Sequence, residues 1–388
     1  RALENAKGLV SAPVLDIQAG SLGNQSGRLS ASDVLNLRVG SGLDNQNGQI
    51  LARITQVNSG VLDNRQGLLQ GDHTLNLSSL DALDNRQGTL FAGQVFNLAS
   101  GSLDNRGGKL GSDSRLTVHV AGQLLNQTGL FSGAGDVQLT AGAVNNSEGR
   151  LYGLANVSLD LKYGHLNNQA GLINAPGQLL LRNLDTVDNQ GGEISSALSF
   201  ELAGASLDNR SGKLLSEQAL TLRIARLLEN TTGRVSAAAL DLNAGSLGNL
   251  SGTVEARDSL LARVEGALDN QQGQLLGTTT VISSASLNND AGLIQGDTLL
   301  SLHQQGELLN RAGRMVSGQV LTLEAGSLDN SHGTWTSNGR LGATVAGALT
   351  NQAGVVAAAG DLSLTSGSLD NQQQGRISSK ANLLVNGG

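Results

Sequence analysis

Carboxylates recur at one position of a repeating pattern, and they are the residues in this chain whose spacing comes closest to a metal site. Aspartate directly precedes a recurrent asparagine in nine copies of the pattern. Stacked carboxylates are oxygen ligands of the kind that Ca²⁺ binds. Other copies carry glycine, leucine, asparagine or threonine at that position, and the glycine-rich pattern of calcium β-rolls is missing. We therefore predict a solvated Asp/Arg edge and no metal site. The nine aspartates are Asp44, Asp63, Asp84, Asp104, Asp188, Asp208, Asp269, Asp329 and Asp370.

Histidine and glycine offer no alternative chemistry. The five histidines occupy unrelated positions of the repeat, and none has a histidine partner at ligand spacing. The pair Gly191–Gly192 does not lead from a strand into a helix, as a phosphate cradle requires. The chain has no cysteine, which excludes disulfides and thiolate ligands. We predict no catalytic, cofactor-binding or metal-binding residues, no cofactor, and a protein that is not an enzyme.

The residue that organises the chain is asparagine, which returns every 19 to 22 residues and is followed three residues later by glycine in eighteen of nineteen copies. A period this regular predicts a solenoid, with one domain running through residues 1–388. We expect a structural row formed by Asn5, Asn24, Asn45, Asn64, Asn85, Asn105, Asn126, Asn146, Asn168, Asn189, Asn209, Asn230, Asn249, Asn270, Asn289, Asn310, Asn330, Asn351 and Asn371.

The apolar positions of the repeat have the period of a strand. Counted from each asparagine, residues at −2 and +5 are apolar and the residue at +7 is small, while +11 and +13 form pairs such as Leu75 and Leu77. This alternation is typical of β-structure and differs from the 3.6-residue period of a helix. We predict an all-β fold, a parallel β-helix of about nineteen coils of roughly 20 residues. At ~4.8 Å per coil its length would be roughly 90 Å.

Each recurrent residue has an expected structural role. Asparagine tolerates the left-handed backbone of a sharp bend, and stacked amides can bond along the axis. Glycine at +3 is expected to supply a second corner with positive φ. Trp335 replaces the usual aliphatic residue at +5 and is expected to fill the core. Near the single 22-residue spacing, Tyr152 and Tyr163 leave two interpretations open, a short tolerated insertion or an aromatic ligand patch.

The charge and hydropathy patterns exclude two classes of partner. The net charge is −7 without a basic run, which argues against nucleic-acid binding. No apolar run reaches the ~18 residues that span a bilayer, and no signal peptide is visible. Because the chain begins and ends within a repeat, we expect it to be an internal fragment of a larger protein.

The recurring Leu-Asp-Asn-x-x-Gly-x-Leu resembles the filamentous haemagglutinin repeats of two-partner-secreted exoproteins; clear copies begin at Leu62 and Leu83. That family includes haemagglutinin adhesins and the CdiA-type effectors of contact-dependent growth inhibition. The resemblance implies a right-handed β-helix and secretion to the bacterial cell surface, outside the outer membrane. It also implies an outer-membrane β-barrel transporter as partner, and a target-cell receptor bound through regions outside this fragment. It carries over no functional residue.

These observations favour a rigid extracellular filament or stalk that presents distal receptor-binding or toxin regions to other cells. One alternative is an adhesive face that binds glycan or protein directly along the rod. A polysaccharide-degrading β-helix enzyme is a weaker alternative, since it needs long loops and paired carboxylates to build a cleft. A leucine-rich repeat is the rival fold, but the glycine at +3 and the lack of a helical half-repeat argue against it.

Overall fold

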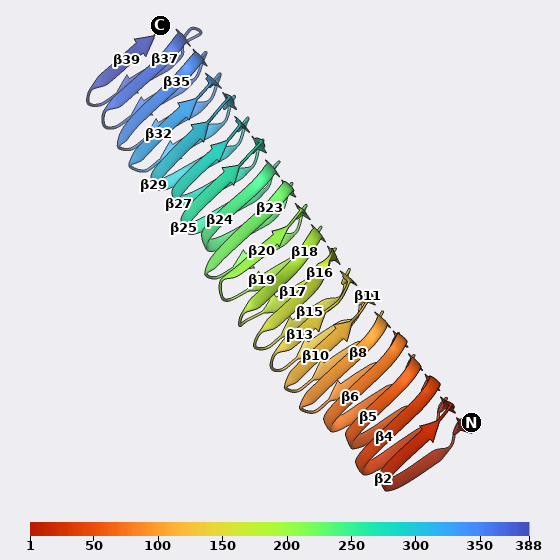
Figure 1. The fold of residues 1–388 in the computed structure, drawn as a ribbon. Helices are drawn as coiled ribbons and strands as arrows, with labels where there is room; N and C mark the ends of the chain where they lie inside the picture. The colour runs from red at the N-terminus through yellow and green to blue at the C-terminus, as the bar shows by residue number, and fades with distance from the viewer. Residues whose placement is uncertain (388) are drawn as a thin grey trace. The chain divides into compact units, whose positions relative to one another are not determined.

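The computed structural model describes residues 1–387 as strands joined by tight turns, with no helix in that range. The chain divides into two compact units, Arg1–Leu198 and Ser199–Gly388, and each is described by itself. The first unit holds β1 to β19 and the second holds β20 to β39 (Figure 1). The domain prediction, a single continuous domain, stays a prediction.

In the first unit, the strands are short segments and longer ones that bend around the coil (Figure 1). They are β1 (Ala2–Glu4), β2 (Leu9–Ala19), β3 (Ser21–Gly23), β4 (Arg28–Asp44), β5 (Gln49–Asp63), β6 (Leu68–Asp84), β7 (Thr89–Ala92), β8 (Val95–Asp104), β9 (Lys109–Ser112), β10 (Arg115–Val120), β11 (Gln123–Leu125), β12 (Leu130–Gly133), β13 (Val137–Thr140), β14 (Ala143–Asn145), β15 (Arg150–Gly153), β16 (Val157–Asn167), β17 (Leu172–Ala175), β18 (Leu179–Asp188) and β19 (Glu193–Ser196).

The second unit repeats this arrangement. Its strands are β20 (Phe200–Gly204), β21 (Ser206–Asp208), β22 (Lys213–Ser216), β23 (Ala219–Glu229), β24 (Arg234–Gly248), β25 (Thr253–Val264), β26 (Ala267–Asp269), β27 (Gln274–Ser284), β28 (Ser286–Asn288), β29 (Leu293–Gln304), β30 (Glu307–Leu309), β31 (Arg314–Ser317), β32 (Val320–Ala325), β33 (Ser327–Asp329), β34 (Thr334–Ser337), β35 (Arg340–Thr350), β36 (Val355–Ala358), β37 (Leu362–Asp370), β38 (Arg376–Ser379) and β39 (Leu383–Gly387).

Every strand pairing within a unit is parallel and joins equivalent residues of successive coils. In the first unit, β7, β9 and β12 pair so that Leu90, Leu110 and Phe131 form one inward column. Because side chains alternate along a strand, the residues between them face outward. With ten asparagine corners in one unit and nine in the other, the turns number about nineteen. The predicted all-β solenoid of parallel coils is confirmed.

The core consists of the positions that the repeat marks as apolar or small. Around the corner at Asn24, Leu22, Leu29 and Ala31 are at most 7% exposed. In the second unit, Trp335 lies in the same kind of column and is fully buried, as predicted. Its indole Nε1 has no hydrogen-bond partner among the described residues. The core is therefore a stack of mainly aliphatic columns that also holds four aromatic side chains, of which Trp335 has a buried N–H without a partner among the described residues.

Differences in coil length are absorbed locally. In a 19-residue coil, Thr55 takes the core position that Leu35 fills in the coil before it, and its hydroxyl donates to the carbonyl of Gln70 at 2.7 Å. In the 22-residue coil, Lys162 and Tyr163 have φ of 50° and 66°, beside a register shift in the pairing of β16 with β18. The longer spacing is thus a bulge in one strand, which agrees with a tolerated insertion.

Candidate functional site

At eighteen of the nineteen corners, the four residues from the recurrent asparagine to its glycine form a tight turn. At Asn24, the backbone N–H of Gly27 donates to the Asn24 carbonyl at 2.9 Å, and Ser26 between them has φ of 54°. A positive φ at the third residue is the pattern of a type II turn. The backbone N–H of Asn24 donates to the carbonyl of Asp44 in the next coil at 2.7 Å. The turn is therefore closed within its own coil and bonded to the next.

The asparagine side chain points into the coil and bonds along the axis. The fully buried Asn24 donates from Nδ2 to Oδ1 of Asn45 at 2.7 Å, and its own Oδ1 accepts from Nδ2 of Asn5 at 2.7 Å. The same Nδ2 lies 3.3 Å from the carbonyls of Gly27 and Gln49. One amide thus satisfies groups of its own coil and of the next coil.

This contact recurs between consecutive asparagines throughout each unit. In the first unit, nine successive Nδ2···Oδ1 distances are 2.7 to 2.8 Å. In the second unit, eight successive distances are 2.7 Å. All the amides point the same way, an arrangement in which hydrogen bonds polarise one another. We call these side chains the asparagine row; its contribution to stability stays a prediction.

Two expectations about the corner are wrong, that the recurrent asparagine takes a left-handed backbone and that the glycine at +3 supplies a positive φ. Positive φ occurs one residue earlier, at +2, and neither the asparagine nor the +3 glycine is among the described residues with positive φ. Glycine is required at +3 because there is no room for a Cβ atom between the backbone of one coil and the asparagine side chains. A Cβ on Gly48 would lie 2.3 Å from the carbonyl oxygen of Asn24 and 2.5 Å from Oδ1 of Asn45. The glycine therefore lets the backbone of one coil lie directly against the asparagine row.

The +2 position holds many residue types with φ between 50° and 65°, although this conformation costs roughly 1–2 kcal/mol for a residue with a Cβ. The bonds of the corner hold each of these residues in place. They are Lys7, Ser26, Asn47, Gln66, Gln87, Gly107, Thr128, Glu148, Ala170, Gly191, Ser211, Thr232, Ser251, Gln272, Ala291, Ala312, His332 and Ala353, and the last corner has Gln373 and Gln374.

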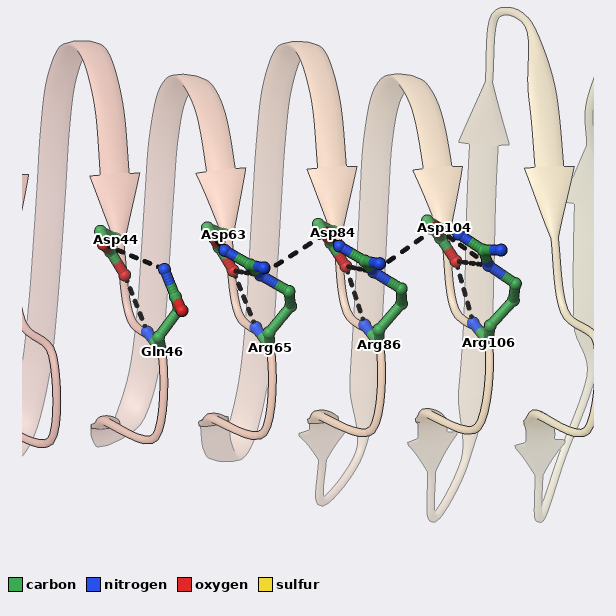
Figure 2. Close-up of polar contacts among 8 residues, drawn as sticks. All are labelled: Asp44, Gln46, Asp63, Arg65, Asp84, Arg86, Asp104 and Arg106. Carbon is green, nitrogen blue, oxygen red and sulfur yellow. Dashed lines mark hydrogen bonds and ion pairs between the residues drawn. The ribbon is translucent and has the colours of Figure 1, made fainter.

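The aspartates that precede the asparagine row form a second row on the outside of the corner, the aspartate row. Oδ1 of Asp63 accepts the backbone N–H of Arg65 at 3.0 Å, and Oδ2 accepts a guanidinium hydrogen bond at 2.6 Å. Figure 2 shows the same arrangement in the two following coils, and Gln46 takes the place of arginine beside Asp44. Arg65 also lies 3.7 Å from Asp84 of the next coil. Arg65 therefore bonds to the aspartate of its own turn and contacts the aspartate of the next coil only weakly, whereas Asp44 also accepts a 2.6 Å hydrogen bond from Gln25 of the preceding coil.

The charges of this edge stabilise one another. For Asp84, burial is the largest single influence and opposes ionisation. Hydrogen bonds from the Arg86 side chain and backbone, with the charges of Arg86 and Arg65, outweigh that influence and lower the Asp84 pKa below its usual value. The hydrogen bond to Asp84 raises the pKa of Arg86 in turn. The Asp84–Arg86 pair is therefore ionised at neutral pH.

Groups of three or more histidine, aspartate or glutamate side chains that could hold a metal ion are absent from the described residues. The carboxylates of Asp63, Asp84 and Asp104 are occupied by arginines of their own turns. His303 bonds to Glu324 at 2.8 Å, and both side chains are exposed. This geometry agrees with the solvated Asp/Arg edge expected from the sequence.

A surface hollow that was not predicted from the sequence lies on the first unit; its volume is about 310 Å³, and Phe91 and Tyr152 help to line it. Tyr163, the other half of the suggested aromatic patch, does not line this hollow. The signal was available: Phe91 and Tyr152 are the only aromatic residues six positions after a recurrent asparagine, where the strand faces outward.

Comparison with known proteins shows which family has this repeat. Within residues 1–387 the structure contains no helix with the length and apolarity needed to cross a membrane. No curated protein and no solved structure matches the chain. The haemagglutinin repeat family matches residues 4–87, 90–159, 154–204, 192–272 and 321–388, which together cover most of the sequence. The repeat recognised in the sequence, the coil it forms and this match agree, and the chain belongs to the haemagglutinin repeat family.

Proposed function

We propose that this chain is a rigid extracellular stalk that presents distal receptor-binding or toxin regions to other cells. The observation that carries the proposal is the asparagine row, in which buried side-chain amides form a hydrogen bond between each consecutive pair of coils inside each unit. A structure in which coil after coil repeats the same corner is suited to holding other regions of a protein at a fixed distance. It offers few of the irregular loops from which binding and catalytic sites are usually built.

The mechanism is geometric. Each added coil extends the solenoid by ~4.8 Å, so the number of repeats sets the reach. Parallel backbone pairing and the asparagine row join every coil to the next, and stability then depends on nearest-neighbour contacts. We propose that the protein has no enzymatic activity. Membership of a family of structural and adhesin proteins supports this, together with the short turns of the coils.

We further propose secretion by the two-partner route, through an outer-membrane β-barrel transporter, to the cell surface. The family is typical of secreted or cell-surface proteins, which supports the location. The absence of cysteine suits a chain that crosses a pore unfolded, because no disulfide can form before passage. Folding that propagates from coil to coil would favour outward movement.

Small-angle X-ray scattering tests the stalk. For the chain we expect a thin particle with a maximum dimension of roughly 90 Å, from coils spaced ~4.8 Å apart. A matched variant lacks residues 209–309, which span five coils from one asparagine to the residue before another. It should be shorter by roughly 24 Å at an unchanged cross-section. A compact particle, or a deletion that narrows the cross-section without shortening the particle, would contradict the proposal.

A further inference from the structure

Aromatic side chains are scarce in this protein, and most of them are buried. The sequence has seven, and four lie in the core: Phe96, Phe131, Phe200 and Trp335. Of the three that reach the surface, Phe91 and Tyr152 line the same hollow of the first unit. Two large rings at one outward hollow are a feature that core packing does not explain.

The register of the strands places the two rings in one line along the axis. Phe91 on β7 pairs with Gly111 on β9, which pairs with Ser132 on β12, which pairs with Tyr152 on β15. All four are partly exposed. Three interstrand steps separate the backbones that carry the two rings by ~14 Å. The hollow is thus a short groove with an aromatic residue at each end and two small residues between them.

A glycine at the floor of the groove leaves space between the side chains on either side. A Cβ on Gly111 would lie 3.4 Å from Cδ2 of Phe91 and 3.4 Å from Oγ of Ser132. The Phe91 ring therefore leans toward Gly111, and any larger side chain there would occupy the groove. Leu154, 63% exposed, adds an apolar wall. The backbone of Gly111 does not need glycine, because its φ is not positive.

The charged residues that line the groove are one cation and one anion, and a further cation lies beside the Tyr152 ring. Lys109 and Asp113 both line it and both are exposed. The guanidinium of Arg150 lies 5.8 Å from the centre of the Tyr152 ring, within the range of a cation–π contact. A groove with both signs of charge has no preference for an anionic or a cationic ligand, and its hydroxyl, carboxylate and ammonium groups suit a ligand rich in hydroxyls.

The backbone N–H and C=O groups of the strands at the groove are already hydrogen-bonded to neighbouring strands. The four strands that form it pair with one another in the parallel ladder, so an extended peptide cannot add to a free edge here. Recognition must therefore come from side chains, which means two aromatic faces, a small floor and a polar rim. Sites of this kind bind ligands that are apolar on one face and polar at the edges.

We propose that the groove between Phe91 and Tyr152 binds a short, neutral carbohydrate. The C–H faces of its sugar rings lie against the aromatic rings, and its hydroxyls bond to Ser132, Lys109 and Asp113. This site goes beyond the stalk function and is independent of it, because the groove occupies four coils of a scaffold that is complete without it.

The test begins with the unmodified chain on an array that carries neutral oligosaccharides of glucose, galactose and mannose beside sialylated and sulfated ones. The neutral oligosaccharide with the strongest signal is then titrated by calorimetry. We expect Phe91→Ala and Tyr152→Ala each to weaken binding about tenfold, since each removes one stacking face. Gly111→Leu should abolish binding by filling the floor.

The matched control is Tyr163→Ala, which removes an aromatic side chain that is 76% exposed and lies outside the groove. It should bind as the unmodified chain does, and circular dichroism melting should show all four variants folded. The proposal is overturned if no neutral oligosaccharide binds, if only anionic ones bind, or if Gly111→Leu, folded, binds normally. A failure here leaves the scattering result for the stalk unaffected.

Discussion

The asparagine row and the aspartate row lie one residue apart in the sequence and behave in opposite ways. Asn64 is fully buried and its amide bonds to Asn85 of the next coil at 2.7 Å. Asp63 is 22% exposed in its side chain and bonds to Arg65 of its own turn. A residue whose partner is the same residue in the next coil must be identical in every coil. A residue whose partner lies in its own turn can vary from coil to coil.

This difference explains why the inner position is the same residue in every copy of the repeat and the outer position is not. The inner position is asparagine in all nineteen copies, whereas the outer position is aspartate in nine. Outside, the pairs can also be rearranged: in the second unit, Arg311 bonds to Asp290 of the preceding coil through both its backbone and its guanidinium. Partners on the inside are the same residue in every coil, whereas partners on the outside lie in the same turn at some corners and in the neighbouring coil at others.

The largest effect should come from breaking the contact of glycine with the asparagine row. In Gly252→Ala, the new Cβ would lie 2.2 Å from the carbonyl oxygen of Asn230 and 2.5 Å from Oδ1 of Asn249. The backbone must move, and we expect a loss of about 3 kcal/mol in the free energy of unfolding, measured with guanidinium chloride. The control is Gly342→Ala, because a Cβ on Gly342 meets nothing within 4 Å. Equal losses in the two variants would show that the row does not require glycine.

A middle effect should come from an inner hydroxyl. Thr280 is fully buried and donates to the carbonyl of Gln295 in the next coil at 2.6 Å. Thr280→Val keeps the shape and removes the donor, so we expect a loss of about 1–2 kcal/mol in unfolding free energy. The same change at the outward Thr322, which bonds to Ser301 at 3.1 Å, should cost much less. A larger loss at Thr322 would reverse the inner–outer difference.

The smallest effect should come from the aspartate row. Asp84→Asn removes a carboxylate whose pKa is lowered in the folded protein by Arg86 and Arg65. A lowered folded pKa means that this stabilisation is present above the unfolded pKa and is lost as pH falls through the folded pKa. We expect a loss below about 1 kcal/mol at pH 7 that vanishes in acid and shrinks in high salt. Melting curves at pH 7 and pH 2.5 check this; a loss that grows in acid would contradict the assignment.

The sequence predicts the repeat more fully than it predicts the corner. Strand periodicity and the position of each asparagine follow from spacing alone, because one residue recurs for every coil. The role of Gly48 could not be predicted correctly, since a glycine needed for space and a glycine needed for positive φ look alike in sequence. The sequence shows that Phe91 and Tyr152 share one outward position of the repeat, but the hollow between them becomes visible only when the coils are stacked.

The asparagine row must stay neutral and inside the coil, whereas the aspartate row need not stay charged. A reciprocal exchange tests it directly: Asn249→Asp and Asp269→Asn, with unfolding measured from pH 4 to pH 8. In Asn249→Asp, the buried carboxylate could not donate to Asn270, and burial would raise the pKa of that carboxylate in the folded state. The variant should be most stable in acid and lose stability as pH rises, while Asp269→Asn should follow the unmodified chain within about 1 kcal/mol. If Asn249→Asp unfolds like the unmodified chain at every pH, the row does not hold the coils together.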